Sequence, residues 1–159
     1  MRVPVTLTVN GVTYPVEVEP GTTLLRAVRE HVGLTGAKEG CDDSECGACM
    51  MLLDGRPVNA CSYLALQAEG RSVTSVEGLS EGGLSPLQEA FLGHGGVQCG
   101  FCTPGMLISA TALLAKQPHP TEEDVRIGLS GNLCRCTGYD GIVKAVLSVA
   151  AARIDESCR

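Results

Sequence analysis

Nine cysteines in a chain of 159 residues constrain the fold of this protein more than any other feature of its sequence. Eight of them form two tight groups, between residues 41 and 61 and between residues 99 and 136, while Cys158 stands alone. On length alone the chain forms one domain or two small ones. Units of under about 90 residues bury only a modest core and usually need a covalent or metal staple. The two groups therefore predict two small folded halves, each stapled through its own cysteines.

The start of the chain indicates whether the cysteines form disulfides or bind metal. Residues 1–4 lead directly into alternating, strand-like sequence without a readable export signal, so we expect a cytoplasmic protein. Thiols stay reduced in that compartment, which favours metal-bound thiolates over disulfides. No apolar stretch reaches the roughly 20 residues that a membrane span requires, so the sequence predicts no membrane span.

The charge of the chain argues against a nucleic-acid partner. It carries 18 acidic and 12 basic residues, a formal net charge of -6, and its aromatic residues are three tyrosines and two phenylalanines. Nucleic-acid binding requires the opposite sign of charge and, for single strands, stacking rings. We therefore expect no nucleic acid among the partners.

The first half of the chain carries the signals of an α+β fold. Alternating apolar residues over 3–9 and 12–18 flank Asn10-Gly11, the pair that a type I′ hairpin turn prefers. Thr22 can cap a helix that runs to about residue 32. The segments predicted after this helix are an irregular loop over 33–47, a hairpin over 50–60 around Asp54-Gly55, and a closing strand over 72–76.

The second half of the chain carries helix signals only. A stretch rich in Gly, Ser and Glu over 77–84 is typical of a linker, and it separates a domain over 1–76 from a helical domain over 85–159. The four helices expected there are one with Leu84, Leu87 and Phe91 inward, one capped at Thr103-Pro104, one opening at Thr121, and one from about Asp140 to about Arg153. Their pattern predicts a small four-helix bundle.

The first cysteine group has the C-x4-C-x2-C…C spacing of a plant-type [2Fe-2S] cluster. Its members are Cys41, Cys46, Cys49 and Cys61. An anionic cluster needs backbone N–H donors around it rather than bulky side chains, and Gly40 and Gly47 let the main chain approach closely. The sequence predicts a [2Fe-2S] site here, with zinc as the leading alternative.

The second cysteine group leaves the metal open. Its members are Cys99, Cys102, Cys134 and Cys136. Four thiolates at C-x2-C…C-x-C spacing suit zinc as readily as iron. The helix predicted from Thr103-Pro104 would turn its positive end toward Cys99 and Cys102, which favours bound thiolates without choosing between the metals.

Three sequence strings carry a family resemblance. Gly40-Cys-Asp-Asp-Ser-Glu-Cys-Gly-Ala-Cys49, Gln98-Cys-Gly-Phe-Cys-Thr-Pro-Gly-Met106 and Gly131-Asn-Leu-Cys-Arg-Cys-Thr-Gly-Tyr139 resemble the signatures of the small iron–sulfur subunit in the xanthine dehydrogenase, or molybdenum hydroxylase, family. The resemblance covers nearly the whole chain, with the motifs in family order. It implies an α+β fold, in which a plant-type ferredoxin-like β-grasp domain precedes an all-α four-helix-bundle [2Fe-2S] domain.

The resemblance also implies a role as an electron-transfer subunit. In that family a large subunit holds molybdenum on a pterin cofactor, molybdopterin, and hydroxylates the substrate. The small subunit carries two [2Fe-2S] clusters and relays single electrons toward FAD in a medium subunit or toward another acceptor. The whole complex is expected to be a dimer of heterotrimers. By resemblance, the cluster on the second cysteine group lies next to molybdopterin, which Gln98 and Cys136 approach. No catalytic residue is expected on this chain.

Two other functions are compatible with the cysteines. A free-standing two-cluster ferredoxin-like carrier would explain the first domain but would leave the helical domain without a purpose. A zinc-stapled adaptor would also use both groups. Cys158 lies beyond the last predicted helix, and we expect it to be a free thiol rather than a ligand.

Overall fold

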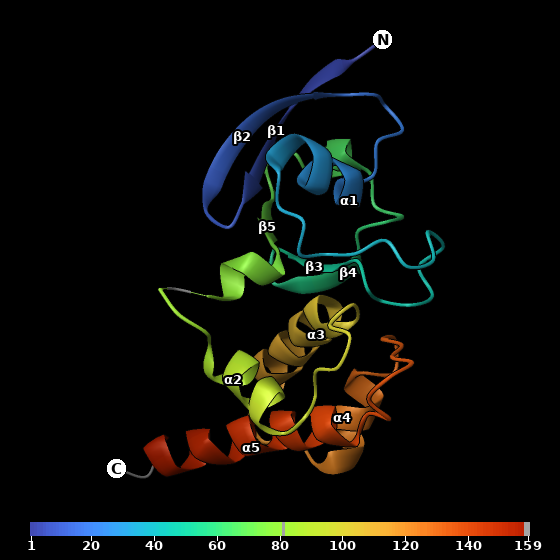
Figure 1. Cartoon of the computed structure of the whole chain (residues 1–159). Coiled ribbons are helices and arrows are strands. Elements are labelled where there is room, and N and C mark those ends of the chain that lie inside the picture. Colours follow the sequence, from blue (N-terminus) through green and yellow to red (C-terminus); the bar gives the residue numbers. More distant parts are fainter. Residues whose placement is uncertain (81, 158–159) are drawn as a thin grey trace.

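The computed structural model of the protein describes residues 1–80 and 82–157. The predicted free thiol, Cys158, lies outside the described residues. Strands fill the first half of the chain and helices the second, as the sequence predicts (Figure 1). Each half has its own hydrophobic cluster, one drawn from residues 5–73 and the other from residues 87–150.

A five-stranded mixed sheet forms the first half. Its spatial order is β2-β1-β5-β3-β4, in which β1 and β5 run parallel and the other neighbours run antiparallel. A mixed sheet whose first and last strands lie side by side, crossed by one helix, is the β-grasp arrangement that the sequence predicts. The strands are β1 (Val3–Val9), β2 (Val12–Val18), β3 (Met50–Leu53), β4 (Arg56–Asn59) and β5 (Ser72–Thr74).

Both predicted hairpins are confirmed, and each turns through two residues with positive φ. Asn10 and Gly11 have φ of 51° and 78°, and Asp54 and Gly55 have φ of 49° and 77°. Left-handed values at both central residues define the type I′ turn, whose twist matches that of the flanking strands. These dipeptides therefore set the register of β1 with β2 and of β3 with β4.

The helix of the first half begins one residue later than the sequence predicts. Thr23, not Thr22, is its cap: the Thr23 hydroxyl accepts a hydrogen bond from the backbone N–H of Arg26 at 3.3 Å. Thr22 is held outside the helix, because its N–H donates to Glu19 and its carbonyl accepts from Ala65. The helix consists of α1 (Leu24–Arg26) and a π-helical turn, η1 (Ala27–Val32).

The closing strand is shorter than predicted. It ends at Thr74, and two 3-10 turns flank it, η2 (Ala65–Ala68) and η3 (Val76–Leu79). The side chain of Asn10 takes the place of a strand partner here, since it donates to the Ser75 hydroxyl and accepts from the Ser75 N–H, both at 2.9 Å. The chain leaves the sheet at this point.

Four helices form the second half, in agreement with the prediction. They are α2 (Pro86–Gly93), α3 (Thr103–Lys116), α4 (Glu122–Gly128) and α5 (Asp140–Ser157). Two details of the prediction are wrong. Leu84 lies before α2 and is exposed, because the helix starts only after its cap, Ser85, which forms a capping box with Gln88. Cys102, not Thr103, occupies the cap position of α3. The Thr103 hydroxyl is buried and has no hydrogen-bond partner among the residues that the structure describes.

α3 connects the two halves. It runs between the β3–β4 hairpin and the other helices, and its buried residues include Met106 and Ile108, both fully buried (Figure 1). Burial of apolar surface on both sides of one helix couples the halves, since neither can expose α3 without losing that burial. Both cysteine groups lie close to the N-terminal half of this helix.

Candidate metal centres

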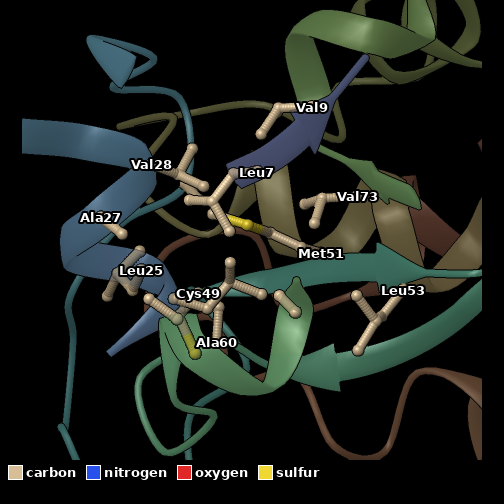
Figure 2. Close-up of a cluster of buried hydrophobic side chains, with 14 of the residues drawn as sticks. Leu7, Val9, Leu25, Ala27, Val28, Cys49, Met51, Leu53, Ala60 and Val73 are labelled. Atoms are coloured by element: carbon tan, nitrogen blue, oxygen red, sulfur yellow. The ribbon is translucent and has the colours of Figure 1, made fainter. Parts of the chain in front are cut away.

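The first cysteine group lies at the junction between the long loop and the β3–β4 hairpin. Cys41 and Cys46 stand on the loop and are partly exposed, whereas Cys49 and Cys61 are 1% and 4% exposed. Figure 2 shows Cys49 beside Ala60 and Leu25, within the hydrophobic core of the first half. One edge of this site is therefore shielded from water, and the other edge faces the protein surface.

Backbone N–H groups point at the sulfur atoms of this group. The N–H of Cys46 donates to the Cys41 sulfur at 3.4 Å. The N–H groups of Ala48 and Cys61 donate to the Cys46 and Cys49 sulfurs. Donors of this kind stabilise negative charge on thiolates and on a bound cluster. The loop thus supplies the environment that its glycines predict.

The loop turns repeatedly through left-handed backbone conformations. Asp42, Ser44 and Gly47 have φ of 62°, 69° and 70°. Left-handed residues in a turning loop direct neighbouring N–H groups toward one centre, as in the backbone concavities that bind anions. The sequence predicts an irregular loop here but no positive φ at Asp42 or Ser44, because residues other than glycine rarely adopt such values outside recognisable turn pairs. Asn59 steadies the loop, since its side-chain amide donates to the Ser44 carbonyl at 3.1 Å.

The second cysteine group joins the start of α3 to the segment between α4 and α5. Cys102 is buried at the cap position of α3, and Cys134 is partly buried. Cys99 and Cys136 are exposed, and their sulfur atoms lie 3.5 Å apart although the residues are 37 positions apart in sequence. Gln98 is also exposed. Cys99 and Cys136 therefore share the open side of this site, and Gln98 is the exposed residue before Cys99 in the chain.

Two neighbours of Cys134 complete the site and were missed by sequence reasoning. The hydroxyl and the N–H of Thr137 lie 3.1 and 3.4 Å from the Cys134 sulfur, and both donate to it. The N–H of Cys134 donates in turn to the Tyr139 hydroxyl at 2.8 Å. Tyr139 adopts a φ of 70°, which returns its side chain toward Cys134. The Thr-Gly-Tyr sequence after Cys136 is the signal that could have identified them.

Burial and hydrogen bonding act on the thiols in opposite directions. Burial raises the pKa of Cys49 to about 12 and that of Cys102 to about 12. The pKa of Cys102 is thus raised at the start of α3, where the sequence predicts that the helix terminus favours the thiolate. Burial is the largest influence on Cys134 and acts to raise its pKa, but the donors of Thr137, the Cys136 N–H and the Cys102 thiol together outweigh burial, and the pKa is lowered. A metal at these sites must displace protons from Cys49 and Cys102, because their free thiols are protonated at neutral pH.

The thiols of each group are arranged as two pairs. Within residues 1–80 and 82–157, no three His, Cys, Asp or Glu side chains gather in a way that could hold one metal ion. The side-chain contacts instead join Cys41 to Cys46, Cys49 to Cys61, Cys99 to Cys136 and Cys102 to Cys134. A [2Fe-2S] cluster has two irons, each of which takes two protein ligands. Two pairs per group fit that cluster better than a single zinc ion with four thiolates.

In the part of the chain that the structure describes, no helix is long and apolar enough to cross a membrane.

Comparison with known proteins agrees with this geometry. The family model for the 2Fe-2S iron–sulfur cluster binding domain matches residues 7–78, and that for the [2Fe-2S] binding domain matches residues 75–147. The small subunit of nicotine 6-hydroxylase from Paenarthrobacter nicotinovorans is 54% identical over 92% of this chain and 88% of its own length. The iron-sulfur-binding subunit of xanthine dehydrogenase from Escherichia coli O157:H7 is 48% identical over 88% of this chain and 89% of its own.

Solved structures extend the agreement to the whole fold. A chain of quinoline 2-oxidoreductase from Pseudomonas putida 86 superposes with a TM-score of 0.93 at 47% identity, covering 98% of this chain and 97% of that one. The predicted α+β fold with a β-grasp domain and a helical [2Fe-2S] domain is therefore confirmed. The two matched families also identify iron–sulfur clusters, not zinc, as the cofactors of both halves. The chain belongs to the xanthine dehydrogenase, or molybdenum hydroxylase, family as one of its small [2Fe-2S] iron–sulfur subunits.

Proposed function

We propose that this protein is the electron-transfer subunit of a molybdenum hydroxylase, with one [2Fe-2S] cluster in each half. The observation that carries the proposal is the arrangement of eight thiols as four pairs, two in each half of the chain. A bound [2Fe-2S] cluster accepts and releases single electrons with little change of geometry. The relatives described above are named as subunits, which favours a role inside a complex over a free-standing carrier.

Each quartet has a definite role in this proposal. The first cluster is held by Cys41, Cys46, Cys49 and Cys61, and the second cluster is held by Cys99, Cys102, Cys134 and Cys136. The protein contributes N–H and hydroxyl donors to the ligand sulfurs, among them Thr137, and it shields Cys49 and Cys102 from water. These contacts stabilise the added negative charge of the reduced state and so help to set each potential.

The second site is exposed, and this exposure supports the idea that electrons enter the protein there. Cys99 and Cys136 lie on the open side of that site, where a partner can approach, and the exposed Gln98 directly precedes Cys99 in the chain. We assign this side to a large subunit that binds molybdopterin, with Gln98 and Cys136 nearest to the cofactor. The first site then transfers electrons to FAD in a medium subunit. The complete assembly would be a dimer of heterotrimers in the cytoplasm.

Domain limits of 1–76 and 85–159, with a linker over 77–84, fit the same proposal. The two hydrophobic clusters lie on either side of this linker, and the two family matches meet at residues 75–78. The linker begins inside η3 and ends just before the Ser85 cap of α2. Each domain would then carry one cluster.

Co-purification of the chain with its partners tests the function. The chain is isolated at its native level with the chains that accompany it, and iron, sulfide, zinc and molybdenum are measured on the isolated complex. We expect two distinct EPR signals from the dithionite-reduced complex, one for each cluster. Cys102→Ser should remove one signal and stop electron flow from substrate, while Cys158→Ser, outside both quartets, should leave both unchanged. Stoichiometric zinc, or a chain that never associates with a molybdenum-binding partner, would show that the proposal is wrong.

A further inference from the structure

A groove lies at the junction of the two halves, between the β3–β4 hairpin and α3. Its volume is about 790 Å³, and none of the eight cysteines of the two quartets lines it. Pro57 on the hairpin and Leu113 on α3 give it an apolar lining. Binding sites for small molecules have volumes of roughly 300–1,000 Å³. The groove therefore has room for several side chains of another polypeptide.

The groove is positively charged, although the chain as a whole has a net charge of -6. Arg56 on the hairpin and Lys116 in the last turn of α3 are exposed and line it, and no Asp or Glu of residues 1–80 and 82–157 does so. Asp54, the acidic residue nearest to Arg56 in sequence, forms its salt bridge with Arg71. Because opposite charges face each other across protein interfaces, the occupant of this groove is expected to be acidic.

Two buried polar side chains in the wall of the groove lack hydrogen-bond partners. Ser109 and Asn132 both line the groove and are 5% and 3% exposed. The Ser109 hydroxyl and the Asn132 side-chain carbonyl have no partner in the part of the chain that the structure describes. The Asn132 amide already donates to the Gly47 carbonyl at 3.1 Å, so its own carbonyl oxygen still requires a donor. A carboxylate cannot donate a hydrogen bond, whereas a backbone N–H can. An extended acidic peptide carries both groups.

The charge, the apolar lining and the unpartnered buried groups all point to one kind of occupant. We propose that the groove binds an extended, acidic segment of a partner subunit. Two carboxylates of the segment pair with Arg56 and Lys116, an apolar side chain between them packs on Leu113, and a backbone N–H approaches the Asn132 carbonyl. The inference rests on the proposed function, since the segment belongs to a subunit of the same complex. A segment bound here contacts both halves of the chain and opposes their separation.

Carbodiimide coupling of the isolated complex tests the contact at Lys116. The reagent joins a lysine amine to a carboxylate in direct contact with it, and peptide mass spectrometry identifies the joined residues. Lys144 lies 2.8 Å from Asp140 within α5 and is the internal positive control. We expect Lys116 to be joined to an acidic residue of a partner subunit. Lys116→Arg keeps the charge but has no amine, so it should abolish that product alone. The proposal is overturned if Lys116 stays uncoupled while Lys144 reacts, or if it couples only to a second copy of this chain.

Charge reversal tests both walls of the groove. Arg56→Glu and Lys116→Glu each place like charges across the interface, so each should weaken association with the partner subunits at least about tenfold at low salt. Arg2→Glu is the matched control, because Arg2 is exposed, lies before β1 and is separated from β3 by β5. It should leave association unchanged. Association of both groove variants as tight as that of the unmutated chain would overturn the proposal.

The two cluster signals in EPR separate the possible failures. Each variant chain should keep both signals, which shows that weaker association does not result from misfolding. An unmutated complex without two cluster signals, or without a molybdenum-binding partner, would refute the proposed function. An intact unmutated complex whose groove variants associate normally would refute only the docking of the acidic segment.

Discussion

The Tyr139 hydroxyl accepts a hydrogen bond from the backbone N–H of Cys134 at 2.8 Å, five positions back in the chain. This bond closes the loop that carries Cys134 and Cys136, and α5 begins at the next residue, Asp140. The loop is therefore anchored to the helical core through Tyr139, which packs against that core.

Tyr139→Phe should weaken the second centre selectively. The change leaves the Cys134 N–H without its acceptor, which costs about 1–3 kcal/mol when the group stays away from water. We expect the second EPR signal to be lost sooner than the first during urea titration of the variant. Tyr14→Phe on β2 serves as the control, and equal loss of both signals in Tyr139→Phe would contradict the prediction.

Thr137→Val should lower the reduction potential of the second cluster. The variant loses the hydroxyl that donates to the Cys134 sulfur at 3.1 Å, and this donor stabilises the more negative, reduced state. The expected shift is on the order of tens of millivolts, measured by an EPR-monitored redox titration. Thr137→Ser keeps the hydroxyl and should restore the original potential. A potential that rises in Thr137→Val would show that the bond does not act in this way.

Gly40→Ala should disturb the first cluster and spare the second. A Cβ at this position would lie 2.7 Å from the Cys46 sulfur, so the ligand or the loop must move. We expect the first EPR signal to be weakened or lost, with the second retained. Gly21→Ala is the matched control, because a Cβ there meets no atom within 4 Å and its φ is not positive. Full occupancy of both clusters in Gly40→Ala would contradict the prediction.

Phe91→Ala should destabilise the helical half. Phe91 is 1% exposed and is among the largest fully buried side chains, so its removal leaves a cavity between α2 and its neighbours. Such substitutions cost about 3–5 kcal/mol. The measurement is the urea midpoint of the second cluster's visible absorption, compared with that of Leu92→Ala, an exposed neighbour on the same helix. Similar midpoints for the two variants would rule out a core role for Phe91.

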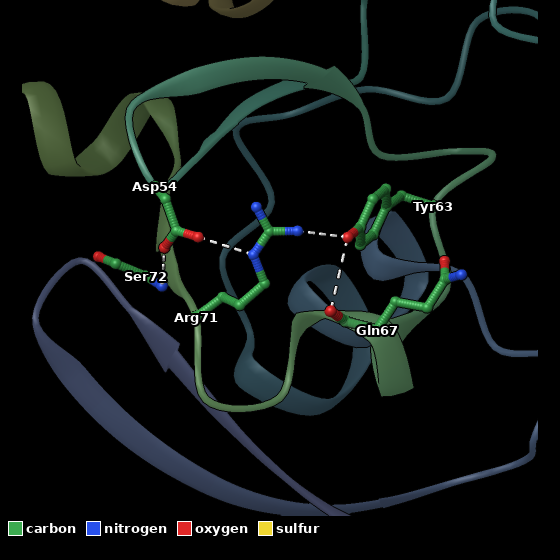
Figure 3. Close-up of polar contacts among 5 residues, drawn as sticks. All are labelled: Asp54, Tyr63, Gln67, Arg71 and Ser72. Carbon is green, nitrogen blue, oxygen red and sulfur yellow. Dashed lines mark hydrogen bonds and ion pairs between the residues drawn. The ribbon is translucent and has the colours of Figure 1, made fainter.

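A hydrogen-bond network that joins the β3–β4 turn to the start of β5 makes a pH-dependent contribution to stability. Asp54 accepts from the Ser72 N–H at 2.9 Å and from Arg71 at 2.7 Å, and Arg71 also donates to Tyr63, whose hydroxyl donates to the Gln67 carbonyl (Figure 3). The Ser72 N–H and then Arg71 hold the pKa of Asp54 below its ordinary value. The carboxylate is therefore the favoured form in the folded protein.

The sign of the pH effect follows from that lowered pKa. The contribution of Asp54 is fully present above the ordinary aspartate pKa of about 3.9 and is lost as the pH falls through the lower folded value. Asp54→Asn should lower the urea midpoint by the same amount at every pH from about 5 to 8, and the difference from the unmutated protein should shrink below about pH 4. A difference in urea midpoint between the two proteins that grows as the pH falls would contradict the prediction.

The sequence alone determined the parts of this protein that depend on local chemistry. The Asn10-Gly11 and Asp54-Gly55 turns were predictable because few dipeptides adopt two positive φ values in succession. The ligand quartets were proposed from cysteine spacing, and the helical half from its apolar periodicity. The helix caps differed from the prediction. Thr23 and Cys102 replaced the expected Thr22 and Thr103, and Thr22 is held outside its helix by a hydrogen bond from the distant Ala65.

Only the tertiary structure decided how the two cysteine groups relate to each other. The bond from Asn132 to Gly47 joins positions 85 apart, and the contact between Cys99 and Cys136 joins positions 37 apart. No local propensity encodes such contacts, because they form only when α3 is buried between the sheet and the other helices. The sequence predicts a close approach of the main chain at Gly47, but it does not show that Gly131 is the residue approached. The chain specifies its ligands residue by residue, but packing brings them together.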